Sequence, residues 1–198
     1  MKLTVVALGV LAAAALTFSP ARADADGHVN FFLGQKSLSS DDWKPLEKQI
    51  EFGAVMSFGQ DDWPVHIAVD VLTSVDQETG YDPAAGDVTL TASTFELDAG
   101  VRKIWKAGKV FPYLGGGVGL IGASTKVDNG FVNVDAVDAA FGFWADAGVF
   151  FRLGSHFNIG LDLRYSTADV DLDFGYGYVA RDVNAGGFGY GLLLGFGW

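Results

Sequence analysis

The chain has 198 residues, with 13 Lys and Arg against 24 Asp and Glu, 27 Gly and no Cys. This length allows one domain or at most two, and 49% apolar residues exclude a disordered acidic tail in spite of the net charge of -11. The negative charge argues against a nucleic-acid partner, because phosphates require clustered Lys and Arg. Without Cys there is no disulfide, no thiolate nucleophile and no Cys-ligated zinc.

The first 23 residues have the three parts of a secretory signal peptide. Lys2 supplies the positive charge, an apolar stretch follows, and Ala21 and Ala23 flank Arg22 in a small-x-small cleavage site. The apolar stretch is shorter than the ~20 residues that a membrane-spanning helix needs. We therefore expect residues 1–23 to be removed on export and residues 24–198 to form the mature domain. That domain is then either soluble or crosses a membrane as strands.

Alternation with period 2 runs through the mature chain and predicts β-strands. In the C-terminal segment every second residue from Phe188 to Trp198 is large and apolar, and five of the six positions from Gly187 to Gly197 that lie between them are Gly. A helix cannot produce this pattern. The predicted strands are 28–36, 48–59, 64–75, 93–105, 110–124, 140–153, 156–168 and 185–198.

The connections alternate in length. Short turns at 60–63, 106–109 and 154–155 contain the residues that hairpins use. The other connections, 37–47, 76–92, 125–139 and 169–184, are longer. All long loops therefore lie at one end of the sheet, which predicts an all-β, eight-stranded antiparallel up-and-down transmembrane barrel.

Volume decides which face of the barrel points outward. Eight strands enclose an interior barely wide enough for side chains, so a soluble, lipocalin-like barrel has no room for the bulky set. We expect the bulky face to contact lipid and the glycines to line the lumen. Trp63, Trp105 and Trp198 lie at the short-turn end and predict an aromatic girdle at the membrane interface. Trp43, Phe95 and Tyr165 are candidates for a second girdle.

Two segments carry a family resemblance. Residues 112–119, Pro-Tyr-Leu-Gly-Gly-Gly-Val-Gly, and the alternating C-terminal strand that ends in an aromatic residue resemble the small outer-membrane β-barrels of the OmpA, OmpX and OmpW type, the outer membrane protein β-barrel domains. The resemblance implies a cell outer membrane location. It also implies that Phe196 and Trp198 form the signal read by the barrel-assembly machinery, although the family more often ends in Phe.

Charged residues occupy the alternate strand positions that are expected to face the lumen. Mixed charges are tolerated inside a barrel when they pair, whereas on the lipid face each would be costly. These residues form either an ion pathway or a salt-bridge network that plugs the lumen, and the narrow bore favours the plug. We therefore expect negligible conductance. The expected network consists of Glu51, His66, Asp70, Glu96, Asp98, Arg102, Asp146, Arg152, Asp162 and Arg164.

The sequence offers little catalytic or metal chemistry. Ser155 and His156 are adjacent in a short turn and make a poor nucleophile and base, so we expect no catalytic residue, no metal site and no cofactor. The alternating acids of Asp169–Asp173 fail as a calcium loop because Phe174 stands where Gly is needed. We interpret them as a strand that extends above the membrane.

The expected function is a structural or surface-interaction role: envelope integrity, adhesion or loop-mediated recognition. The alternatives are a narrow pore for small or hydrophobic solutes, as the resemblance to OmpW permits, and a lipid-A-modifying enzyme. The expected partners are outer membrane lipids including lipopolysaccharide, the assembly machinery and an unknown extracellular ligand. The acidic loops can hold divalent cations that bridge to lipopolysaccharide phosphates, but solvation is the simpler interpretation of their charge.

Overall fold

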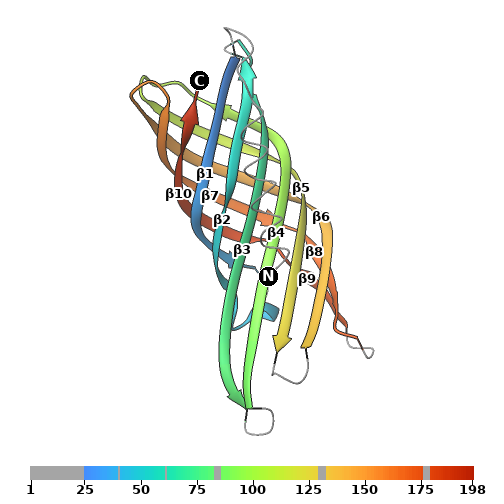
Figure 1. Cartoon of the computed structure of the whole chain (residues 1–198). Helices are drawn as coiled ribbons and strands as arrows, with labels where there is room; N and C mark the ends of the chain where they lie inside the picture. Colours follow the sequence, from blue (N-terminus) through green and yellow to red (C-terminus); the bar gives the residue numbers. More distant parts are fainter. Residues whose placement is uncertain (1–24, 40, 61, 83–85, 129–132, 176–178) are drawn as a thin grey trace.

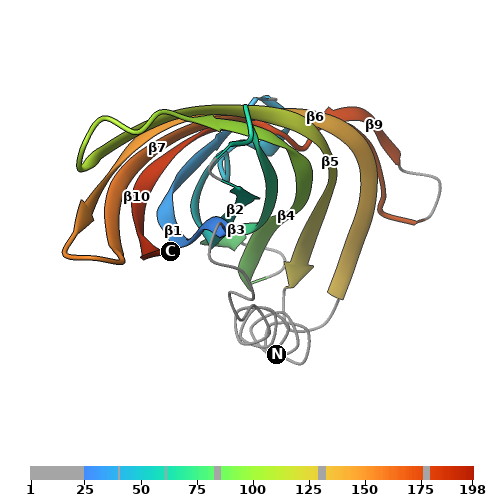
Figure 2. The ribbon, with the colours of Figure 1, turned by 90° about the horizontal axis from the view of Figure 1, so that it is seen from above.

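The computed structural model describes residues 25–39, 41–60, 62–82, 86–128, 133–175 and 179–198. Eight antiparallel strands form a closed barrel in the order β1-β10-β7-β6-β5-β4-β3-β2 (Figure 1). Figure 2 shows β10 beside β1, where the ring closes. The strands are β1 (Ala25–Leu38), β2 (Lys48–Gln60), β3 (His66–Asp82), β4 (Gly86–Ile104), β5 (Val110–Asp128), β6 (Asn133–Leu153), β7 (Phe157–Thr167) and β10 (Gly187–Gly197).

The predicted all-β barrel of eight strands is confirmed. Within the described ranges, no helix has the length and apolar character needed to cross a membrane. The predicted signal peptide, residues 1–23, lies outside the described residues and stays a prediction.

The outward face of the barrel is apolar, whereas the inward face carries glycines and polar side chains together with a buried apolar cluster that includes Phe32, Leu72 and Phe150. On β10, Phe188, Tyr190, Leu192, Leu194 and Phe196 are exposed, while the glycines between them face the lumen. The lumen-facing glycines let neighbouring strands approach closely: a Cβ on Gly117 of β5 would lie 2.2 Å from the Ala99 carbonyl oxygen on β4. Alternation of bulk and glycine therefore builds a narrow barrel with an apolar belt.

Four strands are longer than the sequence predicts. We expected loops at 76–92 and 125–139, but β3 and β4 stay paired as far as Asp82↔Gly86, and β5 and β6 as far as Asp128↔Asn133. The neighbouring pairings stop earlier, β2 with β3 at Val75 and β6 with β7 at Phe143. The prediction of long loops here is wrong. Polar residues on both faces hide the alternation, whereas Thr and Val favour extended backbone.

These four strands project beyond the rest of the barrel as a sheet, the β3–β6 extension (Figure 1). We define it as 76–82, 86–92, 123–128 and 133–142. Its outer face continues the lipid-facing side of the strands, and its inner face continues the lumen side.

A second hairpin covers the inner face of the extension. The predicted long loop at 169–184 contains β8 (Asp169–Asp173) and β9 (Val179–Asn184), which form a two-stranded sheet. The alternating acids of β8 are therefore on a strand, as expected. Val170 and Leu172 are buried, and the Asp171 amide donates to Asp138 Oδ2 of β6 at 2.8 Å. The hairpin thus packs against β6 instead of standing free.

An apolar cluster lies at the long-loop end of the barrel, and we call it the mouth cluster. Trp43 belongs to it and is only 4% exposed; its indole Nε1 donates to the Asn184 carbonyl at 2.7 Å. Trp43 is therefore not part of a second girdle, because the short helix Asp41–Trp43 turns it inward. The cluster consists of Leu38, Trp43, Leu46, Ala92, Ile121, Ala123, Ala136, Ala168, Val170, Leu172, Val183 and Ala185.

The short helix itself is exposed on its solvent side. Lys44 Nζ lies 2.8 Å from Asp41 Oδ1, and the hydrogen bond from Lys44 lowers the pKa of the Asp41 carboxyl from its ordinary value. This pair therefore remains charged at neutral pH.

Candidate functional site

The centre of the lumen is crossed by two arginine side chains. Arg102 Nη2 lies 2.8 Å from Asp70 Oδ2, and Arg102 Nε donates to Asp146 Oδ2 at 3.0 Å. Arg102 Nη1 also donates to the Ser57 hydroxyl at 2.9 Å, so this one guanidinium connects β2, β3, β4 and β6. The guanidinium carbon is 5.4 Å from the ring centre of Tyr113.

The second arginine extends the same contacts across the bore. Arg164 Nη2 of β7 lies 3.0 Å from Asp98 Oδ2 of β4 and 3.5 Å from Asp70 Oδ2 of β3. The Tyr113 hydroxyl donates to Asp162 beside it. We call this group the central arginine cluster; it consists of Arg102, Arg164, Asp70, Asp98, Asp146, Asp162 and Tyr113.

A lysine cluster lies next to the mouth. Lys36 of β1 is 1% exposed and pairs with Glu96 of β4. The Ser166 hydroxyl donates to Glu96 Oε1 at 2.7 Å, and Lys36 Nζ also donates to the Thr94 hydroxyl at 3.2 Å. Glu51 is buried in the same part of the lumen, close to Gly189. The lysine cluster therefore fills the space between the arginines and the mouth cluster.

The remaining two predicted network residues lie at the short-turn end. His66 Nε2 is 2.8 Å from Asp26 Oδ2, and Lys106 Nζ is 3.0 Å from the same oxygen. Arg152 Nη2 is 3.2 Å from His28 Nδ1. His66 and Arg152 thus form a separate rim cluster, while the other eight predicted residues line the central and lysine clusters.

Carboxylates outnumber cations in the lumen. Across the central and lysine clusters, six carboxyl groups face three cations, Lys36, Arg102 and Arg164. Several carboxylate oxygens in this region are buried and have no hydrogen-bond partner. They are Glu51 Oε2, Glu96 Oε2, Asp98 Oδ1, Asp146 Oδ1 and Asp162 Oδ1. The cations are therefore the scarce members of the clusters.

Sequence reasoning missed three of these residues. Lys36, Asp26 and His28 all lie on β1, and all three are buried toward the lumen. Their even numbering places them on the same face as Phe32, so the parity of the first strand was the signal that could have found them. The predicted network begins at Glu51, on the second strand.

The aromatic residues of the predicted girdle lie at the short-turn end. Trp63 and Trp105 are 41% and 47% exposed. Trp198 pairs with Gly27 through two backbone hydrogen bonds, and a Cβ on Gly27 would lie within 2.1 Å of the Trp198 ring. Only glycine at position 27 leaves room for this indole on the barrel wall.

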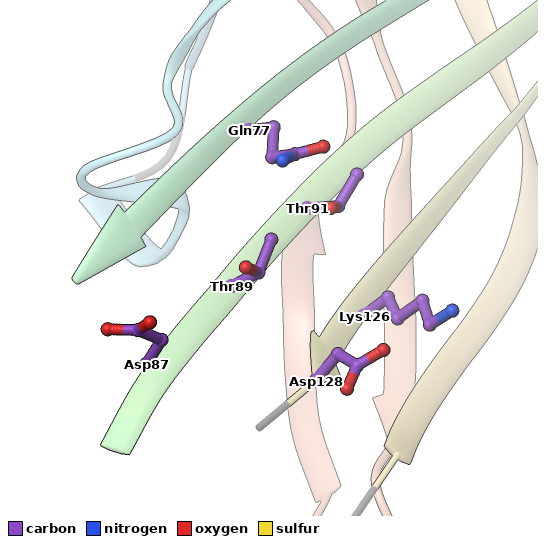
Figure 3. Close-up of a pocket in the computed structure, with 6 residues that line it drawn as sticks. All are labelled: Gln77, Asp87, Thr89, Thr91, Lys126 and Asp128. Atoms are coloured by element: carbon purple, nitrogen blue, oxygen red, sulfur yellow. The ribbon is translucent and has the colours of Figure 1, made fainter. Parts of the chain in front are cut away.

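A polar pocket of about 410 Å³ lies on the β3–β6 extension (Figure 3). The residues that line it come from three adjacent strands and share the outward parity of the lipid-facing wall. Cross-strand register joins Thr91 to Gln77 and Lys126, and Thr89 to Asp128. The lining residues are Gln77, Asp87, Thr89, Thr91, Lys126 and Asp128, and we call this the outer-face pocket.

The long-loop end is strongly acidic. Segments 37–48, 76–92, 123–139 and 167–187 contain 14 Asp and Glu against four Lys and Arg. In the described part of the chain, no three His, Asp or Glu side chains come together as metal ligands. Ser155 and His156 are both exposed in the turn between β6 and β7, at the opposite end.

The comparisons with known proteins agree on the architecture. The model of the family described as outer membrane protein beta-barrel domain matches residues 3–196. Among curated proteins, no sequence matches this chain significantly. The structure is similar to Ail, the attachment invasion locus protein of Yersinia pestis, in complex with the heparin analogue sucrose octasulfate, with a TM-score of 0.62 at 12% identity over 88% of this chain and 99% of Ail.

A second solved structure gives the same picture. The outer membrane protein OprG from Pseudomonas aeruginosa has a TM-score of 0.51 at 14% identity over 88% of this chain and 95% of OprG. At these identities the likeness concerns the fold.

Proposed function

Because this chain belongs to the outer membrane protein beta-barrel domain family and lies in the cell outer membrane, we propose that it is a closed scaffold with a surface-interaction role. The observation that carries this proposal is the β3–β6 extension, which continues past the ends of β2 and β7. A sheet covered on one face by the β8–β9 hairpin is a rigid platform. Such a platform suits recognition better than a flexible loop, because less conformational entropy is lost on binding.

The lumen supports a scaffold more than a pore. The central arginine cluster spans the bore from β4 to β7, and the mouth cluster covers its long-loop end. Eight strands leave an interior that side chains can fill. The proposed role of the charged residues is therefore a structural plug, and the narrow pore is the less favoured alternative.

The negative charge of the long-loop end indicates which kind of partner surface can bind there. Ail was solved with a sulfated sugar analogue, but the long-loop end of this chain is dominated by carboxylates. Complementary potentials steer association and like charges oppose it. We propose a basic or neutral partner surface at the long-loop end.

Replacement of residues 78–90 by an Asn-Gly turn tests this role, because it removes the β3–β4 part of the extension and leaves the barrel. We expect cells that carry the shortened protein to lose adherence to surfaces coated with basic protein. The control variant Lys109→Gln, in a turn at the opposite end, is expected to adhere as the wild type does. Equal adherence of the shortened protein, with heat-modifiable mobility intact, would contradict the proposal.

Conductance provides an independent check on the scaffold. Purified protein in planar bilayers is expected to give no stable single-channel steps. Large, reproducible steps would instead support the pore.

We also propose that Phe196 and Trp198 act as the assembly signal, so that Phe196→Ser slows insertion into the outer membrane.

A further inference from the structure

One edge of the β3–β6 extension has no strand partner. The β2–β3 ladder ends at the pair Ile50↔Val75, whereas β3 continues in register with β4 as far as Asp82↔Gly86. Among the described strands, none pairs with residues 76–82 on the side away from β4, and we call this segment the β3 edge. Figure 1 shows this end of β3 projecting beyond β2. At the opposite side of the extension, the β8–β9 hairpin packs against β6.

The backbone of the β3 edge presents free hydrogen-bonding groups. In an antiparallel ladder, every second residue directs its N–H and C=O toward the same neighbouring strand. The Gln77 amide donates to the carboxylate of Asp76, its own neighbour in the chain, at 2.9 Å, which indicates that this amide faces the open side. Thr79 and Tyr81 share its parity, so their N–H and C=O groups face the same side. A strand that lies alongside the β3 edge therefore meets a row of donors and acceptors.

The position of the β3 edge makes it accessible from outside the membrane. Val75 is the last aliphatic residue on the outward face of β3, and Gln77 and Thr79 follow it on that face. The change from an aliphatic to polar side chains places the edge beyond the hydrocarbon region. Tyr81 stands farther along the same face and is 75% exposed. A polypeptide in solution can therefore approach the β3 edge from the side.

The β3 edge lacks most of the features that protect sheet edges. Natural sheets block their edges with Lys, Pro or a bulge. Residues 76–82 contain no Lys, Arg or Pro, and the pairing of β3 with β4 runs from His66 to Asp82 without a register shift. Asp76 and Glu78 lie on the inner face of the extension. Like charges that face each other destabilise strand pairing, so these carboxylates oppose the same edge of a second copy and favour a basic strand.

We propose that the β3 edge binds an extended basic segment of an extracellular polypeptide as an added antiparallel strand. The backbone of the segment pairs with Gln77, Thr79 and Tyr81, and its side chains alternate between the two faces of the sheet. Lys or Arg at every second position then lies opposite Asp76 and Glu78, where unlike charges stabilise the pairing. The inference rests on the proposed recognition role of the extension and specifies the partner as a strand with alternating basic residues.

The first test measures the binding of a synthetic peptide to the full-length protein in nanodiscs of phosphatidylcholine, a lipid with no net charge that does not attract a basic peptide. The probe is a labelled peptide about as long as the β3 edge, with Lys at every second position between Thr and Val. Its isomer carries the same Lys residues in one uninterrupted run. Fluorescence anisotropy should show about tenfold tighter binding of the alternating peptide, because only that peptide pairs backbone and charge together. Equal affinity of the two isomers would overturn the proposal.

Substitution at Thr79 tests the backbone contact directly. Thr79→Pro removes an N–H group on the open side and leaves the ladder with β4 intact, since an edge strand tolerates Pro where its N–H faces solvent. We expect this variant to bind the alternating peptide about tenfold more weakly. Thr79→Val, which keeps the N–H group, is the matched control and should bind as the wild type does. Equal binding by the two folded variants would contradict an added strand.

Charge variants give a second readout. Glu78→Gln is expected to weaken binding of the alternating peptide about threefold. Asp62→Asn, which removes the same charge at the short-turn end, should leave the affinity unchanged, and equal losses in these two variants would count against the β3 edge. The recognition role is tested separately by the adherence of the protein shortened at residues 78–90. If that protein loses adherence while Thr79→Pro binds the peptide normally, the recognition role stands and the added strand is overturned.

Discussion

Arg164 on β7 and Asp98 on β4 meet across the bore of the barrel, with Arg164 Nη2 3.0 Å from Asp98 Oδ2. Two strands, β6 and β5, separate them around the ring, so their contact is a chord through the lumen. Both side chains are almost completely buried. We expect this chord and the Arg102 contacts to block a water column, which would make the pair the central feature of the proposed plug.

Removal of the Arg164 guanidinium should lower the free energy of unfolding far more than removal of the negative charge of Asp98. Arg164→Met leaves Asp98 buried beside other carboxylates, and loss of one partner of a buried pair costs about 3–5 kcal/mol. Asp98→Asn still offers an acceptor and relieves the excess of carboxylates, so we expect a change below about 1 kcal/mol. Urea unfolding in lipid vesicles measures both. Arg181→Met, at an exposed position, is the control, and equal costs for the two lumen variants would refute the argument.

Trp43 should hold the β8–β9 hairpin without being needed to close the lumen. Trp43→Ala removes a buried ring and its hydrogen bond to Asn184, at a cost of about 3–5 kcal/mol. We expect faster amide exchange in β9 but still no channel steps, because the central arginine cluster remains. Trp105→Ala, at the other end, should leave β9 exchange unchanged. Channel steps from Trp43→Ala alone would show that the mouth cluster is the real barrier.

Two glycines have different reasons for lacking a side chain: at Gly117 a neighbouring strand lies too close for a Cβ, whereas at Gly80 the space is open. A Cβ at Gly117 would lie 2.2 Å from the Ala99 carbonyl oxygen and 2.6 Å from the Gly100 Cα, both of which are backbone atoms. Gly117→Ala is therefore expected to destabilise the barrel by about 1–3 kcal/mol. Gly80 has no atom within 4 Å of its Cβ position, so Gly80→Ala should be neutral or stabilising by about 0.4–1 kcal/mol. Thermal unfolding in detergent distinguishes the two.

The apolar belt can be probed by a single charge. Leu161 of β7 is 57% exposed on the outward face, and an arginine near the bilayer midplane costs about 2–4 kcal/mol. Leu161→Arg should therefore lower the free energy of unfolding in bilayers by this amount. Gln77→Arg, outward but above the belt, should change it by less than about 1 kcal/mol. A similar cost at both positions would mean that the belt is misplaced.

Much of this architecture could be predicted from the sequence. The alternation of bulky residues and glycine on β10 predicted a strand with two different faces. Because the bore of an eight-stranded barrel is narrow, Phe188 and Leu192 were expected to face outward. The same parity assigned Arg102, Arg164 and their carboxylates to the lumen. The extended ends of β3–β6 escaped prediction, because polar residues on both faces of a strand resemble a loop.

The sequence by itself determined which face of the wall each side chain occupies, since parity along a strand is a local property. The tertiary structure decided which lumen residues meet. Strand register and barrel closure brought Arg164 to Asp98 and separated Arg152 and His66 from the central cluster. The short helix Asp41–Trp43 turned Trp43 into the mouth, and the extension of β3, β4 and β5 placed the outer-face pocket above the belt. Contacts across a closed ring depend on the relative height of strands far apart in the chain, and no local pattern carries that information.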